Sequence, residues 1–305
     1  MGTFGRTLER TFESARECGS LTFTPSESIV EKVDGIEYMY TLAPALQKKP
    51  TATRDHKPQL RPSPWDPPEP ELVVEKSFAD RYMVVLNKFA VVPRHFLLVT
   101  KAVEPQSGPL SPPDLAAAMR LLREADADTG KRHLGFYNAG VNSGASIAHR
   151  HVQFIELPTG FTPFVDELVR LNPEYKETQR PLSDTRAPFA HFVVPLTADD
   201  VDEEGLGARF SAVLARVLTV LREQGVPSDE TSYNFVFTQD WMMGVPRRVE
   251  SVEGRGINAV GTVGLLLAKS QADLDFYRSK GPQNVVAAVG FPPVDISQDE
   301  GEYDY

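Results

Sequence analysis

Two imidazoles and an amide recur at every second position of one short segment, and this pattern constrains the fold more than any other feature of the chain. Two histidines and a glutamine stand at every second position, at His149, His151 and Gln153. Side chains two residues apart point to one face of a β-strand and lie about 7 Å apart. The sequence therefore predicts a strand over about 148–157, with these three side chains on one face and an arginine, a valine and a phenylalanine on the other.

An imidazole on such a strand can act as a nucleophile toward phosphorus. With an ordinary pKa of about 6.5, much of it is neutral near pH 7 and keeps a free lone pair. Upstream, residues 138–146 are small and polar, so their backbone N–H groups can approach an anion closely. Together the two segments indicate a phosphoryl site at which attack would give a phosphoramidate.

A His-x-His pair can also bind a metal ion, and two structural histidines are a further possibility. Metal sites usually need a third and often a fourth protein ligand. The chain has six histidines and one cysteine, Cys18, and no Cys-x-x-Cys motif. We therefore predict no protein-bound metal, although the pattern alone leaves the metal alternative open.

The site segment resembles the histidine triad superfamily, in the transferase branch where glutamine replaces the third histidine, as in galactose-1-phosphate uridylyltransferase. Within that branch the chain is similar to the fungal-type diadenosine tetraphosphate (Ap4A) phosphorylases, also called ATP adenylyltransferases. The single cysteine argues separately against the zinc-bearing uridylyltransferases. The resemblance covers about residues 40–290 and is carried further by the segments 45–50, 86–89, 95–100, 189–193, 232–235, 241–247 and 256–258.

This resemblance implies an α+β fold of the histidine triad type, with an antiparallel sheet of two duplicated half-barrels flanked by helices. Residues 1–305 would form a single catalytic unit, with an N-terminal half of about 1–165 that carries the site strand and a C-terminal half of about 166–305. No clear sequence repeat relates the halves, so the duplication rests on the resemblance alone.

Periodicity independently predicts an α+β chain. The dense prolines of 58–70 exclude a helix or a central strand and indicate an extended crossing loop. The amphipathic pattern of 208–224 places Leu218 among the inward residues. The expected strands lie at about 71–77, 81–88, 95–100, 133–139, 189–195, 232–238 and 263–268, and the expected helices at 7–18, 112–126 and 208–224.

The resemblance assigns chemistry to the site strand. His151 would be the nucleophile: it would attack the α-phosphate of one adenylate of Ap4A and expel ATP, and phosphate would then displace His151 to give ADP. Gln153 would hydrogen-bond a phosphoryl oxygen, where the hydrolase branch has a histidine that protonates the leaving group. His149 would orient His151. A related nucleotidyltransferase or dinucleoside polyphosphate hydrolase is the alternative on the same scaffold.

The substrate-binding positions of the family carry over residue by residue. Ala259 and Val260 replace more polar residues and would contribute only backbone groups. We expect no tightly bound cofactor, although Mg²⁺ can accompany the substrate polyphosphate without a protein ligand. The positions are Lys49, Asn87, Lys88, Asn138, Gly144, Ala145, Ser146, Ile147, Gln153, Asn258, Ala259, Val260, Leu265 and Lys269.

Other conspicuous residues have structural interpretations. Trp241 could stack on adenine but is more typical of a core tryptophan. Arg247 and Arg248 could contact phosphates or form a solvated turn. The remaining histidines are expected to be structural, and they are His56, His95, His133 and His191.

The net charge of −10 disfavours nonspecific binding to nucleic acid. A few basic residues in one cleft can still hold an oligophosphate. The sequence contains no apolar run long enough for a membrane-spanning helix, so we expect none. The charged N-terminus does not resemble a signal peptide, which would need an apolar core. We expect a cytoplasmic monomer, with the nucleus as the alternative location, whose partners are Ap4A, ATP, ADP, AMP and phosphate.

Overall fold

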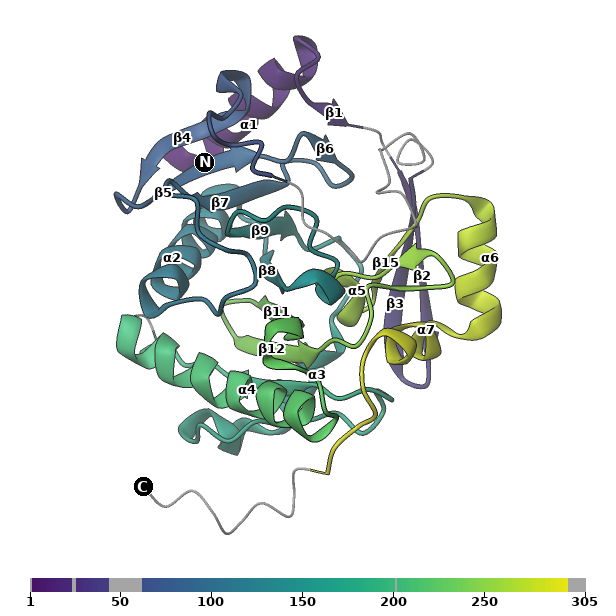
Figure 1. The fold of residues 1–305 in the computed structure, drawn as a ribbon. Helices are drawn as coiled ribbons and strands as arrows, with labels where there is room; N and C mark the ends of the chain where they lie inside the picture. Colours follow the sequence, from purple (N-terminus) through teal and green to yellow (C-terminus); the bar gives the residue numbers. More distant parts are fainter. Residues whose placement is uncertain (1, 24–25, 44–61, 201, 296–305) are drawn as a thin grey trace.

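One large antiparallel sheet organises the chain in the computed structural model (Figure 1). The structure describes residues 2–23, 26–43, 62–200 and 202–295. Eight strands lie in the order β10-β12-β11-β8-β9-β7-β5-β4. Their bounds are β4 Val73–Phe78, β5 Tyr82–Leu86, β7 Phe96–Thr100, β8 His133–Ala139, β9 His151–Glu156, β10 Phe192–Pro195, β11 Tyr233–Phe237 and β12 Trp241–Pro246.

The two faces of this sheet carry separate hydrophobic cores, because side chains alternate along each strand. On β11, Phe235 and Phe237 belong to one core and Val236 to the other. The first core is covered by α1 Thr3–Glu17, α2 Pro112–Thr129 and α4 Glu203–Glu223. The second is covered by α3 Phe164–Leu171, α6 Gln271–Lys280 and α7 Pro282–Val289.

A smaller sheet brings the late part of the chain beside the large one. Strand β15 (Leu265–Ala268) runs parallel to β3 (Ile36–Leu42), which pairs in an antiparallel way with β2 (Glu27–Val33). The short helix α5 (Ala259–Thr262) precedes β15 and contacts β8 and β11. Segments far apart in sequence therefore meet at this junction (Figure 1). Two further pairs are β1 Thr22–Phe23 with β6 Phe89–Ala90, and β13 Ser251–Val252 with β14 Arg255–Gly256.

Most of the predicted elements are confirmed within a few residues, and the strand at 133–139 has the predicted bounds. Helix α2 begins as predicted after Ser111. The Ser111 side chain accepts from the backbone N–H of Asp114, whose carboxylate accepts from the backbone N–H of Ser111, and this reciprocal cap fixes the start of the helix. The α+β class with one antiparallel sheet flanked by helices is confirmed.

Several expectations were wrong in detail. Leu218 is 42% exposed and lies outside the core, because the inward stripe of α4 runs through Val217, as predicted, and then through Val220. The segment 263–268 is not a continuously buried strand: β15 begins at Leu265 and alternates between half-buried and buried residues. The sequence did not predict β12 or the hairpin of β2 and β3.

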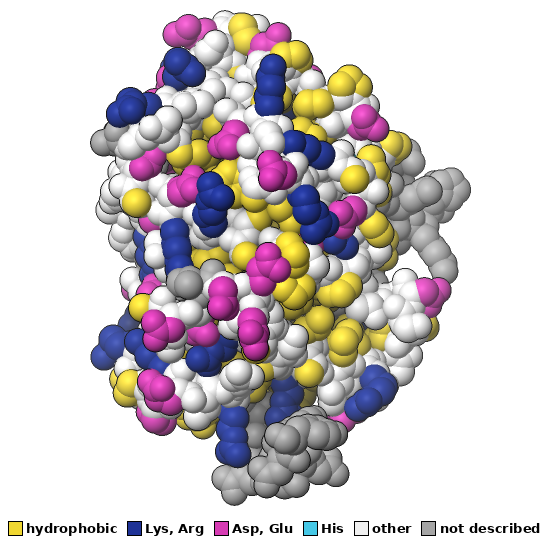
Figure 2. Space-filling view, turned by 90° about the vertical axis from the view of Figure 1, so that its left-hand side faces the viewer, with side chains coloured by type: hydrophobic (Ala, Val, Ile, Leu, Met, Phe, Trp, Pro, Cys, Tyr) yellow, Lys and Arg dark blue, Asp and Glu magenta, His cyan; other side chains and the backbone are white. Residues whose placement is uncertain are grey.

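The two halves of the chain share one sheet, since β8 of the first half pairs with β11 of the second. Their origin by duplication and a division near residue 165 stay predictions. Basic and acidic side chains are interspersed over the face that Figure 2 shows. Within the described ranges, no helix is both long and apolar enough to cross a membrane.

Candidate active site

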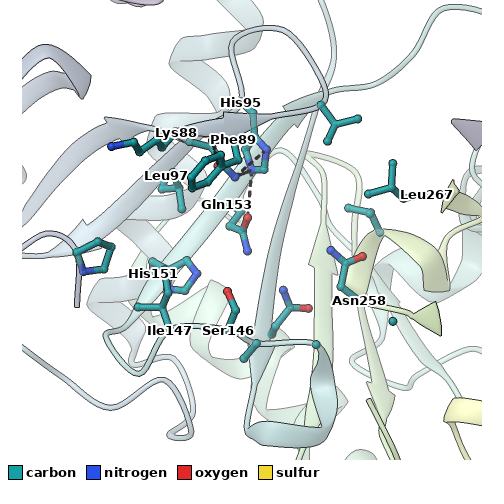
Figure 3. A pocket seen from close by; sticks show the side chains of 18 of the residues that line it. Lys88, Phe89, His95, Leu97, Ser146, Ile147, His151, Gln153, Asn258 and Leu267 are labelled. Carbon is teal, nitrogen blue, oxygen red and sulfur yellow. Dashed lines mark hydrogen bonds between the residues drawn. The ribbon is translucent and has the colours of Figure 1, made fainter. Parts of the chain in front are cut away.

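A cleft of about 570 Å³ opens between the large sheet and the 256–269 segment. Its other walls are the 141–147 loop and the strap, which we define as residues 62–72 preceding β4. The structure thus gathers most of the predicted site residues around one space (Figure 3). The predicted residues that line it are Asn87, Lys88, Asn138, Gly144, Ala145, Ser146, Ile147, His151, Gln153, Asn258, Val260, Leu265 and Lys269.

His151 presents one ring nitrogen to this cleft (Figure 3). Its Nδ1 lies 2.7 Å from the backbone carbonyl of His149. A carbonyl oxygen only accepts hydrogen bonds, so Nδ1 carries the proton and Nε2 keeps the lone pair. This tautomer leaves Nε2 as the nucleophilic atom.

Burial keeps the His151 imidazole neutral. The residue is 5% exposed, and the ring of Trp65 from the strap lies 4.9 Å from its own ring. Removal of water disfavours the imidazolium ion and lowers the pKa of His151 to about 4. The lone pair on Nε2 is therefore available throughout the physiological pH range.

Gln106 holds the backbone of the nucleophile in place. Its Oε1 accepts from the backbone N–H of His151 at 2.8 Å, and its Nε2 donates to the carbonyls of His151 and Asn138. The side chain is 1% exposed, so little water competes for these bonds. Gln106 therefore connects the end of β8 to the start of β9.

The His149 side chain does not face the cleft, which corrects the prediction that it shares one face with His151 and Gln153. Strand β9 begins only at His151, and His149 forms an isolated bridge with Pro105. Its Nε2 donates to the backbone carbonyl of Thr100 at 2.7 Å, and its Nδ1 accepts from the Ser63 hydroxyl at 2.7 Å. The link from His149 to His151 runs through the backbone carbonyl instead.

Gln153 turns its amide nitrogen into the cleft (Figure 3). Its Oε1 accepts from Nε2–H of His95 at 3.1 Å. The Gln153 amide protons are thus directed toward the space in front of His151. An amide can donate a hydrogen bond there but cannot supply a proton to a leaving group.

Asn138 ties the two sides of the cleft together. Its Oδ1 accepts from Nδ2 of Asn234 at 2.8 Å and from the backbone N–H of Ala259 at 2.9 Å. Ala259 is fully buried and absent from the cleft lining within the described ranges, so its backbone N–H serves the fold here. Gly144 has a φ of +86°, and an added Cβ would lie 2.9 Å from Cβ of Asn258. Only glycine allows this approach of the two loops.

Cationic side chains stand at two places on the cleft wall. Lys88 pairs with Glu69 at 2.6 Å, and Lys269 comes from the far side, after β15. Lys49 lies outside the described residues, as does His56.

Arg247 is neither a phosphate contact nor part of a solvated turn, so both interpretations of its sequence position were wrong. It is 1% exposed and donates to the side chain of Asn234 and to the backbone carbonyls of Ser143, Val289, Val249 and Glu250. Burial lowers its pKa to about 9. The exposed Arg248 donates to the carbonyl of Ala288.

Trp241 and two of the other histidines are structural, as predicted. Trp241 is fully buried and donates from Nε1 to Asp166 at 2.7 Å. His133 bonds the Asp126 carboxylate, and His191 links the backbones of Asp184 and Phe189. Across the described part of the chain, no group of three or more His, Cys, Asp or Glu side chains could hold a metal ion.

The roles of Trp65, Gln106 and His95 were not predicted from the sequence. Each acts on a motif residue from a distant segment, so neither spacing nor periodicity marks it. The prolines around Trp65 were one usable signal, since a rigid strap can place an aromatic ring over a site.

Comparison with known proteins identifies the family of the chain. A model described as the Ap4A phosphorylase N-terminal domain matches residues 1–167, and one described as the ATP adenylyltransferase C-terminal domain matches 185–292. The chain belongs to the Ap4A phosphorylase and ATP adenylyltransferase family. It is therefore a nucleotidyltransferase-family enzyme, and the resemblance seen in the sequence is confirmed.

Relatives of this family align over most of their length. Protein APA1 of Saccharomyces cerevisiae is 34% identical over an alignment of 311 positions that covers 96% of this chain and 96% of its own. Diadenosine 5',5'''-P1,P4-tetraphosphate phosphorylase 2 of the same yeast is 35% identical over an alignment of 283 positions that covers 87% of this chain and 86% of its own. The crystal structure of yeast Ap4A phosphorylase Apa2 superposes with a TM-score of 0.86 at 30% identity, covering 96% of this chain and 99% of that one.

Proposed function

We propose that this enzyme catalyses the phosphorolysis of Ap4A to ADP and ATP through an adenylyl group carried on Nε2 of His151. The observation that carries the proposal is the neutral, carbonyl-anchored imidazole of His151 beside the Gln153 amide in one cleft. Relatives at about 35% identity include a yeast Ap4A phosphorylase, and one crystal structure of yeast Apa2 is described as a complex with Ap4A.

In the first step, Nε2 of His151 attacks the α-phosphorus of one adenylate. The bond from that phosphorus to the bridging oxygen breaks, and its electron pair leaves with ATP. The new N–P bond places positive charge on the imidazole, which the His149 carbonyl stabilises through the Nδ1–H hydrogen bond. Gln153 cannot protonate the leaving group, because an amide is not an acid. The polyphosphate needs no such proton, since it leaves as a stable anion.

In the second step, an oxygen of inorganic phosphate attacks the same phosphorus from the side that ATP has left. The N–P bond breaks, His151 recovers its lone pair, and the product is ADP. The Gln153 amide would stabilise the phosphoryl oxygens in both transition states, since its nitrogen faces the space where charge develops.

The cleft offers separate surfaces for the rest of the nucleotide. Phosphates would meet the 144–147 loop, Lys88 and Lys269, while Phe89 and Leu265 supply apolar surface for adenine. Any Mg²⁺ would bind the oxygens of the substrate polyphosphate rather than protein ligands. We further propose that the enzyme acts as a monomer and that AMP, ADP and ATP occupy parts of the same cleft.

Product analysis with and without phosphate tests the proposal. With radiolabelled inorganic phosphate, the label should appear in the β-phosphate of ADP, with one ATP formed for each ADP. Without phosphate, turnover should stop after about one equivalent of ATP per enzyme. Steady release of AMP under either condition would show a hydrolase instead, which is the alternative on the same scaffold.

A further inference from the structure

The Gln153 side-chain amide can adopt two orientations that fill nearly the same space. Rotation by 180° exchanges Oε1 and Nε2 with almost no change in volume, but only one of the two orientations can donate to a phosphoryl oxygen. The reversed amide would direct a carbonyl oxygen at an anion. Something in the structure must therefore select the productive orientation.

His95 contacts the end of the amide that faces away from the substrate space (Figure 3). Its Nε2 lies 3.1 Å from Oε1 of Gln153. His95 precedes β7, and the pairing of β7 with β9 puts Leu97 opposite Gln153. The His95 ring is thus held next to the amide by the register of two central strands.

Asn87 favours one tautomer of His95. The backbone N–H of Phe89 donates to Oδ1 of Asn87 at 3.0 Å, which turns the Asn87 amide nitrogen toward the imidazole. This nitrogen lies 3.2 Å from Nδ1 and 3.5 Å from Nε2 of His95, closer to Nδ1. A donor placed there disfavours a proton on Nδ1, so the neutral ring carries its proton on Nε2 and donates to Gln153.

We propose that His95 is a positioning residue whose Nε2–H fixes the Gln153 amide with its nitrogen toward the reacting phosphorus, and that Asn87 and the Phe89 backbone set the tautomer that makes this possible. The inference rests on the proposed role of Gln153. It assigns a function to a histidine that the sequence marks as merely structural, and it gives Asn87 a duty besides contact with nucleotide.

The test in solution is a set of His95 variants assayed for Ap4A phosphorolysis. His95→Phe keeps a ring of similar size but leaves Oε1 of Gln153 without its donor in the productive orientation, so kcat should fall about tenfold or more. The KM for Ap4A should change less than about threefold, because the amide acts mainly on the transition state. His95→Gln, which retains an N–H donor, should recover most of the lost kcat.

A double-mutant cycle separates this role from general destabilisation. In a Gln153→Ala background, His95→Phe should lower kcat by less than about threefold, since the group that it positions is gone. The matched control is His133→Phe, another histidine buried in the same sheet, which should leave kcat of the folded enzyme unchanged. A His95→Phe loss of equal size with and without Gln153 would overturn the proposal.

A measurement on the wild-type enzyme needs no variant to fold. Long-range ¹H–¹⁵N correlation spectra report which nitrogen of His95 bears the proton, and we expect Nε2. A proton on Nδ1 would overturn the proposal even if phosphorolysis is found. Conversely, failure to detect ADP and ATP as products would refute the proposed function without altering the tautomer.

Discussion

The two long walls of the cleft are built in different ways. On the wall formed by β5, β7 and β9, each reacting side chain is held by named hydrogen bonds: His151 by the His149 carbonyl and Gln153 by His95. The facing wall of 256–269 offers mainly apolar side chains and backbone, with Asn258 and Lys269 as its polar side chains. We infer that the first wall fixes the geometry at the reacting phosphorus, while the second shapes the space for the nucleotide. Substitutions in the first should lower kcat, and substitutions in the second should raise KM.

The largest effect is expected at the nucleophile. His151→Ala should lower kcat by about three orders of magnitude or more, the scale seen when a nucleophile is removed. Ap4A binding, measured by calorimetry, should change only a few-fold.

The control for that variant is His149→Gln, because His151 uses only the backbone carbonyl of residue 149. This substitution should cost about tenfold or less in kcat. Equal losses for the two histidines would contradict the geometry of the first wall.

A smaller effect is expected at Gln153. Gln153→Ala should reduce kcat by roughly 10²–10³ with KM nearly unchanged, the cost of one transition-state donor. Gln153→His adds a group that can deliver a proton, and AMP should then appear alongside ADP. Steady-state kinetics with product chromatography measures both, and an unchanged kcat in Gln153→Ala would remove this residue from the mechanism.

Substitutions in the opposite wall, 256–269, should raise the KM for Ap4A. Lys269→Ala should raise the KM for Ap4A about tenfold, since a hydrogen bond to a charged group contributes about 1.5–3 kcal/mol. The increase should shrink as ionic strength rises. Lys280, which pairs with Glu253 on the surface, provides the matched control through Lys280→Ala. A wild-type KM in Lys269→Ala at low salt would show that this wall does not bind phosphate.

The smallest effect concerns pH. Burial lowers the pKa of His151 to about 4, so formation of the adduct in a single turnover should stay nearly constant down to about pH 5. An ordinary imidazole with a pKa of about 6.5 would be about 90% protonated at pH 5.5. Trp65→Ala admits water to the ring and should move the acid limb upward by up to about one pH unit.

If the rate of adduct formation in the wild type falls with an apparent pKa near 6.5, burial does not depress the pKa of His151. The same shift has a consequence for stability. Because only the unfolded chain binds a proton at His151 between about pH 6.5 and about pH 4, the folded state should lose stability as the pH falls through that window. Urea titrations at pH 7 and pH 5 measure this loss in the free energy of unfolding for the wild type and for Trp65→Ala, and the two values can then be compared.

The sequence predicts what local pattern controls and misses what distant contacts decide. The alternation around His151 and Gln153 gave the site strand, and the small residues near Gly144 gave the loop beside it. The alternation also suggested that His149 shares their face. However, strand β9 begins only at His151, so the two-residue alternation of a strand does not apply to His149.

Arg247 shows a second limit. A dibasic pair is typical of a surface turn or a phosphate contact. Here five acceptors, three of them on the more distant residues Ser143, Asn234 and Val289, compensate the burial of one guanidinium. Such compensation depends on chain segments that are far apart in sequence. The same holds for Gln106, which bonds residues more than thirty positions away.

A search for the covalent intermediate tests the role of His151 most directly. Enzyme incubated with Ap4A in the absence of phosphate, then digested under basic conditions that preserve phosphoramidates, is mapped by mass spectrometry. We predict one adenylyl group on His151, lost on brief acid treatment and discharged as ADP when phosphate is added. An adenylyl group on another residue, or phosphorolysis at the full rate by His151→Ala, would contradict the account.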